Sequence, residues 1–555
     1  MFGAGGGTSS YKEVEEADLL ILWGSNARET HPIFFHHLLK GVHRGARLYV
    51  IDPRRTGSAQ WADTWLGLDV GTDIALANAI GREIIHAGLA NEAFIKRATT
   101  GFAGYHDSVR PWTLEQGERV TGVPAETIRE LAHAYARADR AILCWTLGIT
   151  EHVTAVDNVL SLINLGLLTG HVGRYGSGLN PLRGQNNVQG GGDMGAIPDR
   201  LPGFQDVQND HAARARFEAA WGVELPPKRG WHLSQMFEAM ERGELRTLYV
   251  FGENPAQSEA DSKKALEALE GLDFLIAQDI LMTRTCAMAD VVLPGTASWC
   301  EVEGGTVTNS ERRVQRMRKA LDPPGQARDD HWIIVELARR LGHDWGHPTL
   351  EQAWDELRSL SPMHRGMSYE RLEELGGIQW PCPSEDHPGS LYLHGRLWSE
   401  PVEGRRAPFS VTPWVAPIDE LNDEFPIRLT TGRRLDSYNT GVQTNLYSSP
   451  LRRGETLDLH PEDAANLGVE PGETVKVSSR RGSIQAPVRL DCNLRPGLAF
   501  MTFHFPDEID VNVLTIDATD PKSGTAEYKA TAVQVEKLNG DERQTAGVAS
   551  GRAGK

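Results

Sequence analysis

The chain has 555 residues, 40% hydrophobic and 24% charged, and a formal net charge of -18 at pH 7. Its length is too great for a single domain, and its composition is that of an ordinary soluble protein. The negative charge argues against nucleic acid and anionic membranes as partners, and no apolar run is long enough for a direct membrane span.

Neither the cysteines nor the first residues indicate export or a metal site. The five cysteines are scattered, and none lies in a CxxC or other metal-ligand spacing. The opening sequence MFGAGGG is neither a signal peptide nor a twin-arginine signal. We therefore expect buried free thiols, no metal ligand within this chain, and a cytoplasmic location.

Residues 1–185 are predicted to form a first α/β domain. A strand over Ala17–Trp23 ends at Gly24 and Asn26, and a strand over Arg47–Ile51 ends at Asp52. Such short apolar runs are typical of parallel strands covered on both faces, and ligands bind beyond the carboxyl ends of these strands. Glycine permits a close backbone approach, while Asn and Asp side chains can hydrogen-bond a ribose, base or phosphate.

Further elements are predicted in the same domain. The pattern indicates a helix over Ile74–His86 with Asp73 as its N-cap, and another helix over Ala125–Ala138. A strand over Ala141–Trp145 follows, and then a buried helix over Val159–Leu168 that ends before a glycine.

The segment Asn180–Gly195, NPLRGQNNVQGGGDMG, is rich in amides and glycines and has no apolar period. We predict a long loop that is neither helix nor strand. Amides recognise polar ligands through paired donors and acceptors, and an arginine such as Arg183 presents a fixed fork to a carboxylate. The alternative is a solvated loop with a surface arginine.

The strand pattern of the first domain recurs within residues 186–392. A strand over Thr247–Phe251 ends at Gly252 and Asn254, and a strand over Phe274–Gln278 ends at Asp279. The glycine and the aspartate are 28 positions apart in the first copy and 27 in the second. Matched spacing predicts two nucleotide-binding units, whereas the alternative is an ordinary doubly wound sheet whose strand ends carry Gly and Asp.

The composition changes in the last third of the chain. Residues 393–425 are predicted to be a connector, and residues 426–537 contain short β runs separated by turn residues, as in a small barrel. Residues 538–555 are polar and predicted to be disordered. The predicted fold class is therefore α/β, with two nucleotide-binding domains containing parallel sheets and a C-terminal β-barrel domain.

Four stretches carry a resemblance to a known family: Asn180–Pro198, Gly377–Cys382, Trp414–Leu421 and Glu527–Lys529. The chain resembles the catalytic subunit of molybdenum- or tungsten-dependent formate dehydrogenases, in the bis-molybdopterin guanine dinucleotide oxidoreductase superfamily. The resemblance implies that formate is oxidised to CO2 and that electrons pass to iron–sulfur clusters or to an iron–sulfur or NAD-linked partner subunit. It also accounts for the doubled unit, because two guanine dinucleotides hold one metal.

By resemblance, Arg183 would hold formate beside the metal, and Gln185 would contact a pterin. One dinucleotide would be bound by Gly24, Asn26, Thr30, Asp52, Arg54 and Gly71, with Leu147 and Glu151 nearby. The other would be bound by Gly252, Asn254, Ser258, Asp279 and Thr296, with Asp330 as a weaker member. The barrel would contribute Arg433, Arg434, Tyr438, Asn512, Tyr528 and Lys529. Ser437 stands where the family pattern has His, and His331 stands where it often has Asp.

The resemblance further places a 4Fe–4S cluster and a metal-ligating cysteine or selenocysteine before the position of Met1. We therefore expect that a head segment is missing, that residues 298–326 would pack on it, and that apolar faces are left exposed. The isolated chain would then be poorly soluble or unstable. The alternatives are an inactive cofactor-binding remnant and another enzyme of the superfamily, such as a nitrate reductase. Arg183 and the Ile378–Cys382 stretch favour formate.

Overall fold

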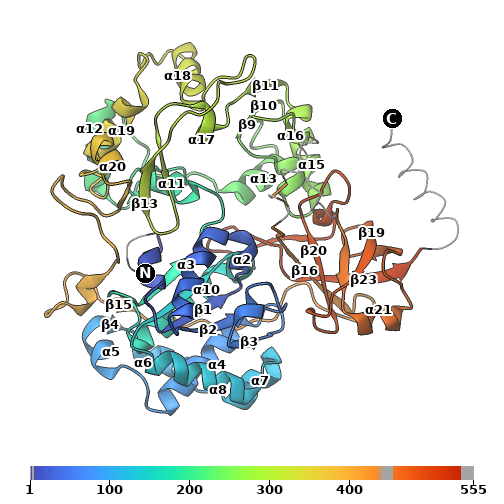
Figure 1. Cartoon of the computed structure of the whole chain (residues 1–555). Helices are drawn as coiled ribbons and strands as arrows, with labels where there is room; N and C mark the ends of the chain where they lie inside the picture. Colours follow the sequence, from blue (N-terminus) through green and yellow to red (C-terminus); the bar gives the residue numbers. More distant parts are fainter. Residues whose placement is uncertain (1, 3–4, 436, 438, 441–453, 539–555) are drawn as a thin grey trace.

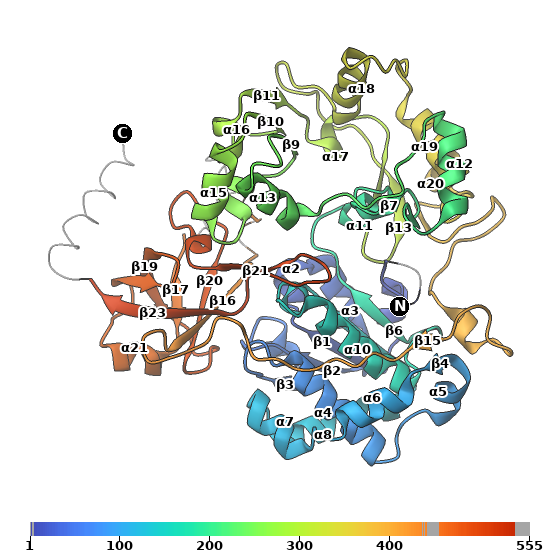
Figure 2. The ribbon, with the colours of Figure 1, turned by 180° about the vertical axis from the view of Figure 1, so that it is seen from behind.

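A computed structural model describes residues 2, 5–435, 437, 439–440 and 454–538 (Figure 1). It contains a mixed α/β region with parallel sheets and a closed β-barrel near the C-terminus, so the predicted fold class is confirmed. Figures 1 and 2 show the first sheet with its helices on one side of the molecule, the second sheet on the opposite side, and the barrel beside both. The domain boundaries given above remain predictions.

The first sheet is five-stranded and parallel, in the order β3-β2-β1-β5-β6. Its strands are β1 (Leu19–Trp23), β2 (Arg47–Ile51), β3 (Thr64–Leu66), β5 (Ala141–Trp145) and β6 (Gly178–Pro181). Every residue of β1 and β5 is buried, which is expected for central strands covered on both faces.

Helices cover both faces of this sheet because successive side chains of a strand point in opposite directions. Leu20 and Leu22 of β1 pack in a cluster with residues of α3 (Pro32–His43), while Leu19 and Ile21 join the cluster on the other face. The helices of that second face are α4 (Asp73–His86), α8 (Ala125–Arg137) and α10 (Ala155–Thr169).

Two helix starts differ from the prediction. Thr72, not Asp73, is the N-cap of α4, and the Asp73 carboxylate instead accepts a hydrogen bond of 2.8 Å from Trp23 Nε1. The helix α10 begins at Ala155, four residues earlier than predicted, and it ends at Thr169, before Gly170 as predicted; Gly170 adopts the left-handed conformation. Each start has a contact with a distant residue that local pattern does not reveal: Trp23 bonds to Asp73, and Val156 N in α10 donates to Asp520 Oδ2 at 3.2 Å.

The prediction that Asn180–Gly195 is neither helix nor strand is wrong. Strand β6 extends to Pro181, and a short helix, α11, spans Val188–Asp193. Asn187 precedes this helix with a φ of 67°, and its Oδ1 accepts a hydrogen bond of 3.0 Å from Thr308 N. The helix is held by side-chain hydrogen bonds rather than by an apolar stripe, so it has no hydrophobic period to find.

The second sheet is three-stranded and parallel, in the order β11-β10-β9, with β9 (Thr247–Phe251), β10 (Phe274–Asp279) and β11 (Val291–Pro294). Its helices α13 (Leu233–Glu241) and α15 (Ser262–Glu270) share an apolar cluster with Leu248 of β9. The strands expose Phe251 (46%), Phe274 (39%) and Val291 (38%), unlike the central strands of the first sheet.

A small antiparallel sheet lies between the second sheet and the connector. It consists of β12 (Thr306–Thr308), β13 (Arg313–Arg316) and β14 (Ile378–Gln379). The helices nearby in sequence are α18 (Asp330–Arg340), α19 (Leu350–Leu360) and α20 (Tyr369–Glu374).

The barrel closes in the order β16-β20-β17-β19-β18-β23 around a core that includes Leu429, Leu457 and Val477. Its strands are β16 (Ile427–Gly432), β17 (Leu457–Leu459), β18 (Thr474–Ser478), β19 (Ser483–Leu490), β20 (Leu498–Thr502) and β23 (Thr531–Lys537). Ahead of the barrel, β15 (Ala407–Pro408) pairs with β4 (Thr99–Thr100), which fixes the connector to the first domain (Figure 2). Among the described residues, no helix combines the length and apolar character needed to cross a bilayer.

Candidate functional site

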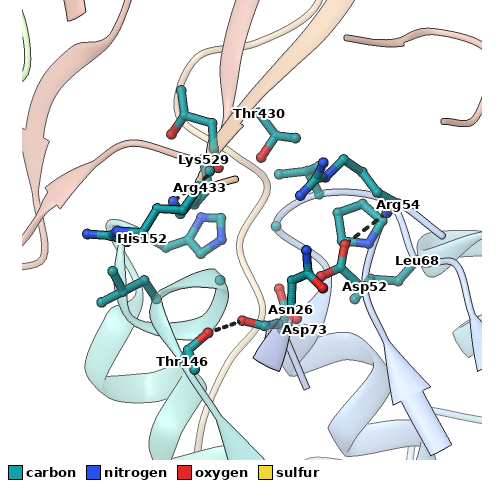
Figure 3. Close-up of a pocket in the computed structure, with 18 of the residues that line it drawn as sticks. Asn26, Asp52, Arg54, Leu68, Asp73, Thr146, His152, Thr430, Arg433 and Lys529 are labelled. Carbon is teal, nitrogen blue, oxygen red and sulfur yellow. Dashed lines mark hydrogen bonds between the residues drawn. The ribbon is translucent and has the colours of Figure 1, made fainter. Parts of the chain in front are cut away.

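A pocket with about 730 Å³ of empty space lies at the carboxyl edge of the five-stranded sheet, where the barrel packs against it (Figure 3). Its lining includes the following residues that the sequence analysis proposed for cofactor binding: Gly24, Asn26, Thr30, Asp52, Arg54, Gly71, Leu147, Arg433 and Lys529. The structure therefore brings residues from the start and the end of the chain to one place.

Gly24 allows two strand ends to meet at this pocket. Its φ is 57°, and a Cβ added there would lie 2.9 Å from the carbonyl carbon of Gly148. The Gly24 carbonyl accepts hydrogen bonds from Gly148 N at 3.2 Å and from Thr146 Oγ1 at 2.6 Å. A side chain at position 24 would separate the ends of β1 and β5 and fill the approach to the pocket.

The wall of the pocket combines cations with a buried carboxylate. Arg54, Arg433 and Lys529 supply positive charge, and the Arg54 guanidinium lies 3.5 Å from the ring centre of Phe500. Asp52 is 8% exposed, and burial raises its pKa to about 6, although Arg54 opposes the shift. Cations suit phosphate groups, and a carboxylate accepts hydrogen bonds from a base or a sugar.

Sequence reasoning missed two ionisable residues of this pocket, Asp73 and His152. His152 Nδ1 lies 3.1 Å from Glu527 Oε1. Burial by itself would lower the pKa of His152, but the Glu527 carboxylate raises it above its usual value. Their positions in the sequence could have indicated both residues. His152 directly follows Glu151, and Asp73 stands at the start of a predicted helix next to the strand ends.

The segment Glu527–Lys529 connects the barrel to both sheets. Lys529 Nζ forms an ion pair of 2.6 Å with Glu151 of the first domain. Tyr528 Oη donates a hydrogen bond of 3.2 Å to the carbonyl of Ser258 in the second, and Asn512 Nδ2 donates to the same oxygen at 3.2 Å. These contacts link the barrel to the regions that contain the two sheets.

A second pocket, with about 570 Å³ of empty space, adjoins the first and shares Thr30, Leu147 and Arg433 with it. It also contains Gln185, Arg434 and Ser437. Among the described residues, Arg434 Nε and Ser437 Oγ are buried without a hydrogen-bond partner. Buried polar atoms are almost always satisfied, so this pocket offers polar groups to a ligand. The predicted residue Tyr438 lies outside the described residues.

Arg183 does not line either pocket, although its neighbours Leu182, Gly184 and Gln185 line the second one. Its Nη2 donates to the carbonyl of Gly5 at 2.8 Å, and its Nε donates to Gln189 Oε1 at 3.2 Å. The guanidinium thus points toward α11 and the N-terminal segment.

The residues predicted for a second dinucleotide lie at the carboxyl ends of β9 to β11 and just beyond them. Asp279 Oδ1 accepts hydrogen bonds from the backbone N of Ile280 and Leu281 at 2.7 and 3.3 Å, and Asp330 accepts one from Gln278 at 2.7 Å. Gly252 has a φ of 66° and open space where a Cβ would stand. Thr296 Oγ1 is buried, and no partner for it exists within the described part of the chain.

Comparison with known proteins identifies the family. Residues 4–340 match the molybdopterin oxidoreductase family, and residues 427–532 match the molybdopterin dinucleotide binding domain. The chain belongs to the molybdopterin oxidoreductase family. It is therefore a member of a family of redox enzymes, and the two matched regions meet at the first pocket.

Known relatives cover most of this molybdopterin oxidoreductase. It is 42% identical over 545 residues to the F420-dependent formate dehydrogenase 2 subunit alpha of Methanococcus maripaludis, with 97% of this chain and 79% of that protein covered. It is 38% identical over 542 residues to formate dehydrogenase H of Escherichia coli, covering 97% and 75%. The acetylene hydratase of Pelobacter acetylenicus has the same fold, with a TM-score of 0.73, 20% identity, and coverage of 96% of this chain and 79% of that one.

The two pockets fit the organic part of a molybdopterin cofactor. The first combines cations suited to phosphate groups with a close glycine contact, and the second contains polar atoms of Arg434 and Ser437 that have no hydrogen-bond partner among the described residues. No group of three or more His, Cys, Asp and Glu side chains within the described ranges is arranged to hold a metal ion. The fit therefore concerns the dinucleotide and pterin rather than metal ligands from these residues.

Proposed function

We propose that this chain is the alpha subunit of a formate dehydrogenase that oxidises formate to CO2, a proton and two electrons. The observation that supports this most strongly is the 42% identity to a formate dehydrogenase alpha subunit, because it extends over 97% of the chain. That relative is named as one subunit of an enzyme, so we further propose partner subunits that receive the electrons through iron–sulfur clusters or a nicotinamide.

The cofactor proposed is a molybdenum or tungsten bis-molybdopterin guanine dinucleotide. The first pocket would bind one dinucleotide, with Arg54, Arg433 and Lys529 facing its phosphates and Asp52 accepting hydrogen bonds from its base or ribose. The edge of the second sheet at Gly252 would bind the other. When bound, the metal supplies the acceptor for the two electrons that leave formate.

The role proposed for Arg183 is to orient the formate carboxylate and to stabilise its charge. Gln189 engages its Nε and the Gly5 carbonyl engages one N–H of Nη2, so the fork proposed for a carboxylate is formed by Nη1 and the second N–H of Nη2. In the structure, Nη2 donates a hydrogen bond to the Gly5 carbonyl, and this bond holds the guanidinium in place. The Gly5 carbonyl oxygen is an acceptor, as a carboxylate oxygen is.

The test is formate oxidation with an artificial electron acceptor, using the protein purified from its source with its partner subunits. Arg183→Lys removes the planar fork while keeping the charge. We expect kcat/KM to fall by about 100-fold or more, which corresponds to about 3 kcal/mol for a lost charged contact. Arg140→Lys is the matched control, because Arg140 pairs with Asp18 on the surface, and it should leave activity unchanged.

Metal and guanine content are measured in each variant, so that loss of cofactor is distinguished from loss of catalysis. Wild-type kcat/KM in Arg183→Lys would show that Arg183 has no role in turnover. A protein with bound cofactor that turns over no formate would be an inactive cofactor-binding remnant, and one that reduces nitrate instead would be a different enzyme of the superfamily.

A further inference from the structure

A buried chain of hydrogen bonds leads from Arg183 into the protein. Arg183 Nε donates to Gln189 Oε1 at 3.2 Å, and Gln189 Nε2 donates to Asp193 Oδ1 at 2.8 Å. The other Asp193 oxygen, Oδ2, accepts a hydrogen bond of 2.7 Å from Trp380 Nε1. Gln189, Asp193 and Trp380 are 1%, 0% and 1% exposed, so water does not compete for the hydrogen bonds among these three residues.

The donors and acceptors of this hydrogen-bond chain allow only one orientation of the Gln189 amide. An indole N–H and a guanidinium can only donate, and an ionised carboxylate can only accept. Asp193 therefore requires the NH2 group of Gln189, which turns the Gln189 carbonyl oxygen toward Arg183. If the Asp193 carboxylate were replaced by an amide, the Gln189 side chain could rotate and present its NH2 group to Arg183. The Arg183 guanidinium has no acceptor, so the hydrogen bond between the two residues would be lost.

The same arrangement determines which edge of Arg183 remains for a ligand. Gln189 binds the Nε position, and Gln189 Nε2 also donates to the Gly5 carbonyl at 3.2 Å, the oxygen that receives Arg183 Nη2 at 2.8 Å. The guanidinium is thus held at its Nε and Nη2 groups by acceptors whose positions depend on Gln189. Holding a charged fork in one direction reduces the entropy lost when it binds a carboxylate.

We propose that Asp193, acting through Gln189, is a positioning residue that fixes the direction of the Arg183 guanidinium and thereby sets the affinity of the site for a small carboxylate. The inference rests on the proposed function of Arg183 and adds a residue that touches neither substrate nor cofactor. Trp380 belongs to the stretch Gly377–Cys382, and its Nε1 donates to Asp193 at the far end of the hydrogen-bond chain. This contact gives that stretch a physical role in the same site.

The experiment compares Asp193→Asn, Arg183→Lys and the double variant in the purified complex. For each protein, kcat and KM for formate are measured, and calorimetry gives the affinity for acetate, a carboxylate that this reaction does not oxidise. Asp193→Asn is expected to raise KM and to weaken acetate binding by about tenfold, with a smaller change in kcat. In the Arg183→Lys background the same substitution should change both affinities by less than about twofold, because coupled residues are not additive.

Two further variants separate positioning from folding. Gln189→Met removes the connection while keeping the volume, and it should weaken both affinities in the same way as Asp193→Asn. Asp520→Asn is the matched control, because Asp520 is a buried carboxylate, 2% exposed, that accepts backbone hydrogen bonds from Lys522 and Ser523. It should leave both affinities unchanged.

The outcomes distinguish this inference from the proposed function. If Arg183→Lys weakens acetate binding but Asp193→Asn and Gln189→Met leave it within twofold, the positioning role is wrong and the role of Arg183 stands. An equal effect of Asp193→Asn in both backgrounds would also overturn the inference, because Asp193 would then act independently of Arg183. If Arg183→Lys changes neither affinity, the proposed role of Arg183 fails, and the inference fails with it.

Discussion

Replacing Lys529 by methionine tests how the barrel is held on the first domain. Lys529 is 6% exposed, and its Nζ pairs with Glu151 Oε2 at 2.6 Å and donates to the Thr431 carbonyl at 3.1 Å. Removing one partner of a fully buried pair costs about 3–5 kcal/mol, whereas an exposed pair contributes about 0–1 kcal/mol. The Glu151 side chain keeps 17% exposure, so we expect Lys529→Met to cost about 2 kcal/mol of unfolding free energy.

The assay is urea denaturation of the cofactor-free protein, with hydrogen exchange of the β16 and β23 amides to identify the transition that reports the barrel. A chain of this size need not unfold in one step. Lys264→Met is the matched control, because Lys264 pairs with Asp517 but is 46% exposed, and it should cost less than about 1 kcal/mol.

A second substitution sharpens this test. Glu151→Gln combined with Lys529→Met removes both charges, so no unpaired buried charge remains, and the double variant should be more stable than Lys529→Met alone. The reasoning is refuted if Lys529→Met costs no more than Lys264→Met, or if the double variant is the least stable of all.

Three further predictions concern the pockets and the Arg183 network. Gly24→Ala should lower the unfolding free energy measured by urea denaturation by about 2 kcal/mol or more, because its Cβ would lie 2.9 Å from Gly148 at a φ of 57°. Gly88→Ala, at a φ of 67° with open space around the added Cβ, measures the conformational cost alone. Equal losses in the two variants would exclude the clash. Burial raises the pKa of Asp52 from 3.8 to about 6, so its contribution to the free energy of unfolding is present below about pH 4 and is lost as pH rises through about 6. Asp52→Asn should flatten the dependence of the unfolding free energy on pH between these values. An unchanged slope would contradict the assignment. Burial likewise raises the pKa of Asp193 to about 6, although the charges of Arg183 and Arg312 oppose the shift. The KM for formate should therefore rise as pH falls below about 6 in the wild type and should stay constant in Asp193→Asn. A parallel rise in both proteins would exclude Asp193 as the titrating group.

The sequence predicts strands β1, β2 and β5 of the first sheet because their signal is local, but it does not predict β3 or β6. Leu19–Trp23 is a run of five apolar residues, and all five are buried in a central parallel strand. Asn26 and Asp52, which end two such strands, lie in one pocket, as the topology of parallel sheets requires. His152 was missed because its partner Glu527 lies 375 positions away in the chain.

The direction of Arg183 could not be predicted for the same reason. Its acceptor, the Gly5 carbonyl, is 178 positions earlier, and the short helix that carries Gln189 has no apolar period. Sequence pattern places Arg183 in a long loop, whereas in the structure it follows strand β6, which ends at Pro181. Only the folded chain shows that the neighbouring residues Leu182, Gly184 and Gln185 line a pocket while the Arg183 guanidinium hydrogen-bonds to Gln189 and Gly5.

The two copies of the repeated pattern share backbone geometry but not hydrogen bonding. In the first copy, Asn26 lines the pocket, and its Oδ1 accepts hydrogen bonds from Ser58 N and Oγ at 3.3 and 3.1 Å. In the second copy, Asn254 donates to Gln257 at 2.7 Å and accepts from Thr285 N and Oγ1 at 3.1 and 2.8 Å. Both ends of the Asn254 amide are therefore used within the protein.

This difference changes what each copy can offer a nucleotide. At the second edge, space is open beside Gly252 and the buried Thr296 hydroxyl has no partner among the described residues, whereas both ends of the Asn254 amide are engaged. The repeated spacing thus specifies where strands end and where the backbone is open, because those features depend on glycine and on strand length. Which side chains face a ligand depends on tertiary partners, and for this reason a pattern present twice in the sequence does not form the same site twice.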